Sequence, residues 1–370
     1  MEHYLDNAAT TKTCPEAIEA AVQVMNQIYG NPSSTHTKGR EAKKYLNECR
    51  KTVSAALGAK PEEIVFTSCG SESDNWALLS GAEAMKRKGK HIISSMVEHD
   101  AVRRTLDLLE QRGYEVTRLR PDSTGKISED AVLSAIRDDT VLISLMLVNN
   151  ETGAVNDIRR ISDAVKMHGS SALIHTDAVQ GFLKIPFRAS SLGADMISIS
   201  GHKIHAVKGI GALYIRNGLR LNPLICGGEQ ESGRRAGTEA MPQIAAFAAA
   251  CRLDPCINQM ASLKKHLINY LTAEIPEVQY LDTEAPHILS ISMPGWRSEV
   301  LMNFLEAREV YVSKSSACKQ GKRSHVLEAI GMKNDLIDGA IRIGLSRYTT
   351  EADLHALVEG LSESRKLSHR

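Results

Sequence analysis

The sequence predicts an α/β protein in which a large domain with a mixed or mostly parallel sheet is joined to a smaller α+β domain. Three observations carry this prediction: the length of 370 residues, a series of short continuous apolar runs, and a change of pattern near residue 251. A chain of this length exceeds the usual size of one domain, so two domains with a substantial core are expected.

The first element is a predicted amphipathic helix over residues 15–29. Its apolar residues recur at helical spacing and form one stripe, made of Ile18, Ala21, Val22, Met25 and Ile28. Five short apolar runs follow and are predicted strands, at 63–67, 91–95, 141–148, 172–176 and 196–200. Because these runs are continuous rather than alternating, the strands are expected to be covered on both faces, as in a parallel sheet.

The pattern after residue 251 differs and predicts the second domain. It contains a predicted helix over 258–275, two predicted strands near 288–293 and 340–345, and a last helix that carries Leu354, Leu357, Val358 and Leu361. No low-complexity linker or internal repeat separates the two parts, so the boundary rests on this change of pattern alone.

Composition excludes several classes of function. With 45 basic and 44 acidic residues, the formal net charge is +1, which gives no general attraction to nucleic acid or to a membrane surface. Neither a secretory leader nor an apolar run of about 18 residues is present, so a soluble, cytoplasmic protein is expected. The seven cysteines lack zinc-site spacing and are expected to be reduced thiols; His202 and His205 have no further ligands, so no metal is expected.

Unusual polar residues follow the predicted strands. Gly70 and Ser71 begin a helix whose free amides suit a phosphate, although Ser71 or Ser73 could equally act as an ordinary N-cap. Later strand ends offer His99, Asn149, Asn150, Asp177, Gln180 and Lys203. Ligands collect at such strand ends in open α/β sheets. A lysine, an acid, an anion cradle and a ring-stacking group together are what a pyridoxal phosphate pocket needs.

Ten segments of the chain resemble one known family, the cysteine desulfurases, which are fold-type I pyridoxal phosphate enzymes. The segments occur in the family's order and cover nearly the whole chain: "YLDNAATT", "GNPSSTHTKGR", "IVFTSCGSESDN", "EHDAV", "VNNETG", "HTDAVQ", "SGHKIHAVKGIGALY", "GRRAGTE", "SSAC" and "IRIGLSRYTTEAD". "SSAC" followed by "SHVL" is similar to group I of the family, which supplies sulfur for iron-sulfur clusters and tRNA thiolation.

The resemblance implies a role for each matching residue. Lys203 would hold pyridoxal 5'-phosphate as an imine, Asp177 would pair with its ring nitrogen, and His99 would stack on the ring and relay a proton. Gln180 would bind the phenolic oxygen, and Asn150 and Arg342 would bind the substrate carboxylate. The phosphate would be held by Gly70, Ser71, Ser200 and His202, and by Thr238 of the neighbouring subunit in a homodimer.

Cys318 distinguishes this family from other pyridoxal phosphate enzymes. The resemblance implies that its thiolate takes the sulfur of L-cysteine as a persulfide and leaves L-alanine. Lys314, Lys319, Lys322 and Arg323 surround it in sequence and would favour the thiolate. The persulfide would pass to an acceptor protein, such as an iron-sulfur scaffold or a tRNA thiolation enzyme. Residues 13–250 would form the large domain, and 1–12 with 251–370 the small domain that carries Cys318.

Two other readings stay open. One is a selenocysteine lyase or another carbon-sulfur lyase on the same fold, and the other is a non-catalytic scaffold for sulfur transfer. Cys318 disfavours the first, since a lyase need not store sulfur on the protein, and the intact set of Lys203, Asp177 and Arg342 disfavours the second. Three departures from the family pattern also bear on the site: Cys69 in place of glycine, Ala206-Val207 in place of Gly-Pro, and Ser232 in place of a basic residue.

Overall fold

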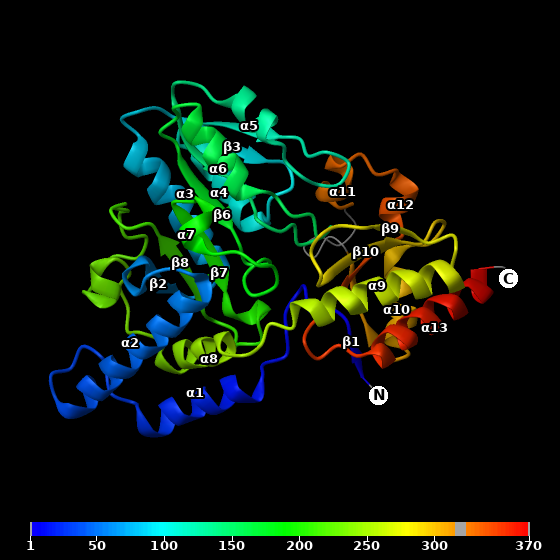
Figure 1. The fold of residues 1–370 in the computed structure, drawn as a ribbon, viewed down its shortest axis with the longest axis horizontal. Helices are drawn as coiled ribbons and strands as arrows, with labels where there is room; N and C mark the ends of the chain where they lie inside the picture. The colour runs from blue at the N-terminus through cyan, green and yellow to red at the C-terminus, as the bar shows by residue number, and fades with distance from the viewer. Residues whose placement is uncertain (1, 315–322, 369–370) are drawn as a thin grey trace.

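A seven-stranded sheet is the centre of the larger part of the molecule (Figure 1). The structure, a computed structural model, describes residues 2–314 and 323–368. The strand order is β2 (Ile64–Thr67), β8 (Gly211–Ile215), β7 (Met196–Ser200), β6 (Leu173–Asp177), β5 (Thr140–Ser144), β3 (His91–Ser95) and β4 (Glu115–Leu119). β8 is antiparallel to β2 and β7, and every other pair is parallel. The predicted mixed, mostly parallel sheet is confirmed.

Helices cover both faces of this sheet, which explains why its strands are continuously apolar. Ile64 and Phe66 of β2 pack into one core cluster, and the intervening Val65 packs into the cluster on the opposite face. The second of these faces is covered by α3 (Gly70–Met85) and α4 (Asp100–Gln111). The first is covered by α1 (Pro15–Gln27), α2 (Thr37–Leu57), α5 (Glu129–Ala135), α6 (Ile158–Met167), α7 (Ala189–Leu192) and α8 (Met241–Cys251).

Helix α1 is present as predicted, but its large apolar side chains do not form the packed face. Ile18, Val22 and Met25 are 50%, 44% and 57% exposed, whereas Ala17, Ala21 and Val24 are buried. The packed face of α1 is determined by its neighbour, the alanine-rich α8 (Figure 1). Small side chains let two helices approach closely, so the alanine face of α1 makes the contact.

A four-stranded antiparallel sheet centres the smaller part of the molecule. Its order is β12 (Ser313–Lys314), β13 (Ala340–Gly344), β10 (Ile288–Ser292) and β9 (Gln279–Leu281). Its helices are α9 (Ile257–Glu274), α10 (Ser298–Glu306), α11 (His325–Ala329), α12 (Asn334–Asp338) and α13 (Glu351–Ser368). The predicted helix 258–275, both predicted strands and the final helix are therefore present. The domain bounds themselves stay a prediction, although the predicted boundary falls where α8 ends.

The N-terminal segment connects the two parts. β1 (His3–Tyr4) pairs in parallel with β11 (Val310–Tyr311), and Asp6 forms an isolated bridge with Gly344 at the end of β13. Leu5 is buried in the core cluster of the smaller part, and Ala8 is buried in that of the larger part. The backbone of residues 5–9 therefore crosses between the two sheets at a fixed place.

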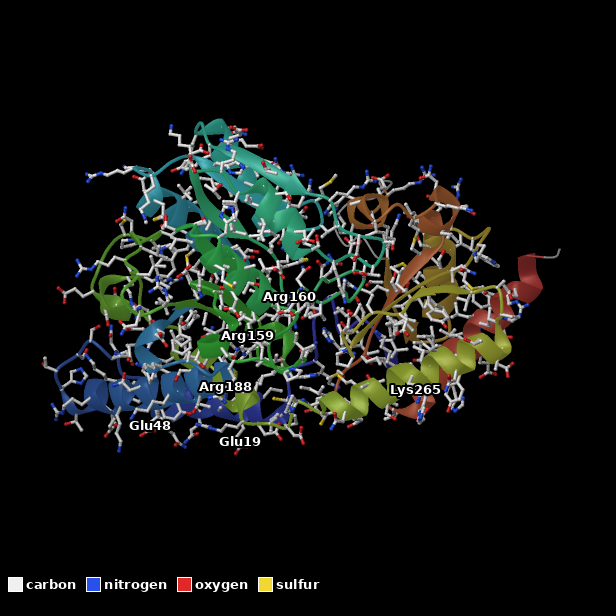
Figure 2. The ribbon with its side chains drawn as sticks, turned by 45° about the horizontal axis from the view of Figure 1, so that its top comes forward. Glu19, Glu48, Arg159, Arg160, Arg188 and Lys265 are labelled. Atoms are coloured by element: carbon white, nitrogen blue, oxygen red, sulfur yellow. The ribbon has the colours of Figure 1, made fainter. Side chains whose placement is uncertain are left out.

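Charges of both signs are spread over the outside of the helices. Figure 2 labels examples on five elements or their flanks, all of them exposed: Glu19, Glu48, Arg159, Arg160, Arg188 and Lys265. This mixture agrees with the net charge of +1. Within residues 2–314 and 323–368, no helix is both long enough and apolar enough to cross a membrane.

Gly344 offers a test of the N-terminal crossing. Its N–H donates to the Leu5 carbonyl, and an added Cβ would lie 2.4 Å from the backbone nitrogen of Ala8. We expect Gly344→Ala to lower the free energy of unfolding by about 1–3 kcal/mol, because backbone cannot yield as a flexible side chain can. Urea denaturation followed by circular dichroism measures this change.

The control is Gly81→Ala inside α3. There the nearest atom to an added Cβ is the terminal methyl of Met196 at 3.0 Å, which can move, and alanine favours a helix. Equal losses of stability in the two variants would show that the crossing is not tightly packed.

Candidate active site

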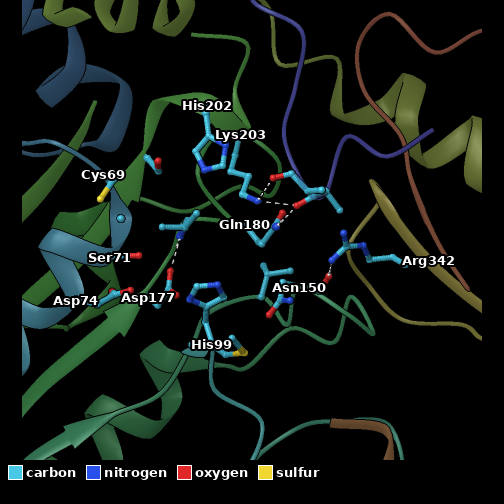
Figure 3. Close-up of a pocket in the computed structure, with 17 residues that line it drawn as sticks. Cys69, Ser71, Asp74, His99, Asn150, Asp177, Gln180, His202, Lys203 and Arg342 are labelled. Atoms are coloured by element: carbon cyan, nitrogen blue, oxygen red, sulfur yellow. Dashed lines mark hydrogen bonds between the residues drawn. The ribbon is translucent and has the colours of Figure 1, made fainter. Parts of the chain in front are cut away.

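A cavity of about 320 Å³ opens at the carboxyl ends of the parallel strands (Figure 3). β6 ends at Asp177 and β7 ends at Ser200, so both residues reach the cavity directly from the sheet. Arg342 on β13 lines the same cavity from the smaller sheet. The sequence-predicted residues that line it are Gly70, Ser71, His99, Asn150, Asp177, Gln180, Ser200, His202, Lys203 and Arg342.

Lys203 lies in a single 3-10 turn that follows β7. Its Nζ donates hydrogen bonds to the carbonyls of Ala8 at 2.7 Å and Ala9 at 2.6 Å, which are provided by the N-terminal crossing. Burial lowers the pKa of Lys203 to about 7, and the positive charge of Arg342 acts in the same direction. A substantial fraction of this amine is therefore neutral and nucleophilic at neutral pH.

Asp177 supplies a buried carboxylate opposite this lysine. One of its oxygens accepts a hydrogen bond from the Val179 N–H at 2.9 Å. Burial raises the pKa of Asp177, while the charges of His99 and Lys203 act against that rise. A cationic ring nitrogen bound beside Asp177 would compensate its desolvation, so the position suits a protonated pyridine.

An anion cradle lies at the start of α3. Cys69 is the N-cap residue and its side chain makes no capping hydrogen bond; the Ser73 hydroxyl is instead bonded to Thr67. The alternative of an ordinary serine N-cap is therefore not what the structure shows. Gly70 is required at this turn, because a Cβ there would lie 2.8 Å from a methyl carbon of Val179. The helix start offers free amides and the positive end of its dipole to an anion.

Two buried polar groups at the cavity lack hydrogen-bond partners within the described residues. Ser200 Oγ and Gln180 Oε1 are both buried without a hydrogen bond, although Gln180 Nε2 donates to the Ala8 carbonyl at 2.8 Å. Unpaired buried polar atoms are costly unless a ligand or water satisfies them. His202 lies beside them, with Nδ1 3.1 Å from Thr10 Oγ1, and burial lowers its pKa to about 3.

Arg342 forms the opposite wall and is 1% exposed. Its Nη1 donates to the Asn150 carbonyl at 2.8 Å, and its Nη2 donates to Ser313 Oγ at 2.8 Å and to an Asp6 oxygen at 3.3 Å. Its Nε is buried without a partner in the described chain. A guanidinium with a free donor, beside Asn150, suits a carboxylate ligand.

His99 faces the same end of the cavity as Asp177 and is the exposed N-cap of α4. Its Nδ1 accepts the Ala101 N–H at 3.1 Å, which holds the ring in place. One ring nitrogen of His99, one carboxylate oxygen of Asp177 and one carboxylate oxygen of Asp74 all lie within 4.8 Å of one another. The sequence analysis missed Asp74, although its place four residues after Gly70 puts it on the same face of α3.

Thr238 is the predicted site residue of the described chain that does not line this cavity. Thr238 is exposed and is not among the residues that line it, so within one chain it does not reach the anion cradle. Cys318 lies outside the described residues. The predicted effect of nearby cations on its thiol stays a prediction. Of those cations, Lys314 pairs with Glu299 at 2.6 Å and Arg323 pairs with Asp338 at 2.7 Å.

Comparisons with known proteins agree with this geometry. The model of the aminotransferase class-V family matches residues 3–357. The chain therefore belongs to the class-V aminotransferases. Among curated relatives, a cysteine desulfurase of Nostoc sp. (strain PCC 7120 / SAG 25.82 / UTEX 2576) is 41% identical, covering 97% of this chain and 92% of the relative. Cysteine desulfurase IscS of Methanosarcina thermophila is 40% identical over 97% of this chain and 91% of its own.

Solved structures show the same likeness. A NifS-like protein superposes with a TM-score of 0.93 at 35% identity, covering 99% of this chain and all of that chain. A structure described as SspA in complex with cysteine has a TM-score of 0.83 at 33% identity, with 95% and 100% covered. Within its family, the chain thus falls among the cysteine desulfurases, as its sequence motifs predict.

The lowered pKa of Lys203 can be tested by its reactivity. Bound aldehydes are first removed with hydroxylamine. We then expect the rate at which a small amine-reactive reagent labels Lys203 to reach half its maximum at a pH of about 7. An amine with the ordinary lysine pKa of about 10.4 would instead gain reactivity tenfold per pH unit up to about pH 9. Peptide mass spectrometry measures the labelling rate.

Arg342→Gln is the matched variant for this titration. It removes a positive charge that lowers the pKa of Lys203, so the midpoint should move to higher pH. A wild-type labelling rate that is still rising at about pH 9 would contradict the lowered pKa of Lys203.

Proposed function

We propose that this cysteine desulfurase uses pyridoxal 5'-phosphate to convert L-cysteine to L-alanine, and that Cys318 receives the sulfur as a persulfide. The single observation that carries the proposal is the position of the Lys203 amine between the Asp177 carboxylate and the Arg342 guanidinium in one cavity. An amine of lowered pKa, an acid and a carboxylate-binding cation together suit the reaction of an amino acid on an aldehyde cofactor.

The residues at the cavity fit the cofactor group by group. The cradle of Gly70, Ser71, Ser200 and His202 would hold its phosphate, with the unpartnered Ser200 hydroxyl as a donor. Asp177 would hold a proton on the ring nitrogen, Gln180 would bind the phenolic oxygen, and His99 would stack on the ring. When bound, the cofactor supplies an electron sink for the negative charge that develops on the substrate.

The chain's own residues would orient the substrate and move its protons. Arg342 and Asn150 would bind the L-cysteine carboxylate, which fixes the Cα–H bond relative to Lys203. The Nζ of Lys203, neutral near pH 7, would accept the Cα proton, and His99 would relay a proton at the same end of the cavity. The Asp177 carboxylate would keep the ring nitrogen protonated throughout.

Sulfur transfer would then occur at Cys318. Its thiolate would attack the sulfur of the bound cysteine, so a sulfur–sulfur bond forms while the carbon–sulfur bond breaks. The electron pair of the broken bond stays on carbon, which takes up a proton and leaves as alanine. This role comes from the "SSAC" motif and the family resemblance.

Homodimer formation, a cytoplasmic location and an acceptor protein belong to the same proposal. If Thr238 contacts a phosphate, a second copy of the chain must provide it, because Thr238 lies outside the cavity of its own chain. The exposed apolar side chains of α1 (Ile18, Val22 and Met25) offer a surface for such contacts. The persulfide would be passed to an iron-sulfur scaffold or a tRNA thiolation enzyme.

A selenocysteine lyase, or another carbon-sulfur lyase, is the second candidate, and the full cavity is compatible with it. The distinction depends on Cys318, because such a lyase releases its product without storing it on the protein. Turnover of cysteine and selenocysteine should be compared in the wild type and in Cys318→Ser. Equal loss of both activities favours persulfide chemistry for both substrates, whereas retention of selenocysteine turnover alone would indicate a lyase.

Cys318→Ser should keep the visible absorbance of bound pyridoxal phosphate but lose almost all sulfide release, because a hydroxyl cannot accept the sulfur. After cysteine is added to the wild type, mass spectrometry should find one extra sulfur on the peptide that contains residue 318. Cys226→Ser is the control, since Cys226 is an exposed free thiol away from the cavity. Undiminished sulfide production by Cys318→Ser would exclude the assigned nucleophile.

Arg342→Ala should raise the Michaelis constant for cysteine by roughly thirtyfold or more, which corresponds to about 2 kcal/mol, because a buried carboxylate loses its charged partner. Arg342→Lys keeps the positive charge but loses the planar guanidinium, so its Michaelis constant should lie between those of the wild type and Arg342→Ala. Circular dichroism checks that each variant is folded. An unchanged Michaelis constant in Arg342→Ala would remove Arg342 from the substrate site.

A further inference from the structure

Asp74 is a buried carboxyl group at the cavity for which the proposed function has no use. It lies on α3 and is 1% exposed. Its oxygen lies within 4.8 Å of an Asp177 oxygen and of a His99 nitrogen, and Figure 3 shows Asp74 and Asp177 side by side. Its Oδ1 is buried and has no hydrogen-bond partner in the described chain.

Two carboxyl groups this close in a buried site oppose each other's ionisation. The cost of desolvating each charge is added to the repulsion between them, so one group keeps a proton to higher pH. The surroundings of Asp74 and Asp177 indicate which of the two is protonated.

Asp177 has the surroundings of the ionised member. The Val179 N–H donates to it at 2.9 Å, and the charges of His99 and Lys203 both favour its anion. A backbone N–H and nearby positive charges stabilise a carboxylate and give nothing comparable to a neutral acid.

Asp74 has the surroundings of the protonated member. Within ion-pairing distance, the described residues bring only one basic nitrogen to it, His175 Nε2 at 3.6 Å. That ring is buried between the hydroxyls of Ser144 at 2.9 Å and Ser198 at 3.0 Å. Burial lowers the pKa of His175 to about 3, so it brings no positive charge.

Burial and the acidic groups that face Asp74 also favour its protonation. Burial raises its pKa most, followed by the negative charge of Asp177, with smaller effects from Glu98 and Cys69, while the Ser198 hydroxyl acts in the opposite direction. Glu98 accepts hydrogen bonds from Ser95 Oγ and the Met146 N–H, and burial raises its pKa to about 8. The groups that face Asp74 are thus Asp177 and His175 on β6, Glu98 and His99 before α4, and Cys69 before α3.

We propose that Asp74 is a positioning residue that carries the one proton shared by the two carboxyl groups and so leaves Asp177 as the only anion of the pair. The pair then has a charge of −1, which one protonated ring nitrogen can balance. This consequence for the cofactor rests on the proposed function, whereas the location of the proton does not.

The proton held by the pair can be measured on the full chain without pyridoxal phosphate. A buried acid that stays protonated costs stability as pH rises above its unfolded value of about 3.9, because only the unfolded state releases the proton. Asp74→Asn lacks this loss. The ratio of the folding constant of Asp74→Asn to that of the wild type should therefore rise with pH, by up to tenfold per pH unit between roughly pH 5 and 7.

Urea unfolding at each pH gives this ratio, and infrared spectroscopy gives a second readout. The absorption of protonated carboxyl groups at pH 7 should be weaker in Asp74→Asn than in the wild type by the share of one group, while the share of Glu98 remains. A ratio that does not change with pH, together with an absorption that is undiminished in the variant, would overturn the proposal.

The role toward Asp177 is tested on protein loaded with pyridoxal phosphate. Asparagine matches a neutral aspartic acid in shape and charge, so Asp74→Asn should bind the cofactor within about threefold of wild type and keep the pH profile of its visible absorbance. Asp177→Asn, the matched variant, should weaken cofactor binding at least tenfold. Equal weakening in both variants would show that Asp74 is ionised and would contradict the proposal.

The two sets of measurements separate the proposal from the function it builds on. If the wild type takes up no pyridoxal phosphate, the proposed function fails, while the unfolding ratio and the infrared band still decide whether the pair holds a proton that Asp74→Asn removes. If the wild type takes up the cofactor but Asp74→Asn does not, the function stands and the neutral state of Asp74 is wrong.

Discussion

The site depends on how the Lys203 amine is held. Its Nζ donates to the carbonyls of Ala8 and Ala9, and among residues 2–314 and 323–368 no carboxylate forms an ion pair with it. Backbone carbonyls stabilise the charged amine less than a carboxylate would, so burial can keep its pKa near 7. The same carbonyls belong to the segment that bridges β11 and β13 to the large sheet. The nucleophile is therefore placed by the contact between the two parts of the molecule.

A separation of charge along the cavity follows from this arrangement. The carboxyl groups of Asp74 and Asp177 reach it from α3 and β6, and the guanidinium of Arg342 reaches it from the small sheet. Buried charges at fixed positions orient a ligand whose charges are complementary, since water does not screen them. An aromatic cation and a substrate carboxylate can then occupy opposite ends, with Lys203 between them. Substrate orientation thus depends on both sheets.

Much of the fold could be predicted from the sequence because strands buried on both faces leave continuous apolar runs. The antiparallel β8 was missed, although "GALYI" is itself such a run, and β4 was missed because only Leu119 in it is buried. The packed face of α1 could not be predicted, since the alanines of α8 determine which side of α1 approaches closely. Most of the site came from motifs at strand ends. Asp74 was missed because its significance depends on Asp177, which is distant in the sequence.

The central claim is that Lys203 is the residue which binds the cofactor covalently. The most direct measurement is borohydride reduction of the protein loaded with pyridoxal phosphate, followed by peptide mass spectrometry. Reduction converts the imine into a stable secondary amine, and the account predicts that the modified peptide contains residue 203 at close to one cofactor per chain. Attachment at another buried lysine of lowered pKa, such as Lys184 or Lys264, or at no single lysine, would contradict it.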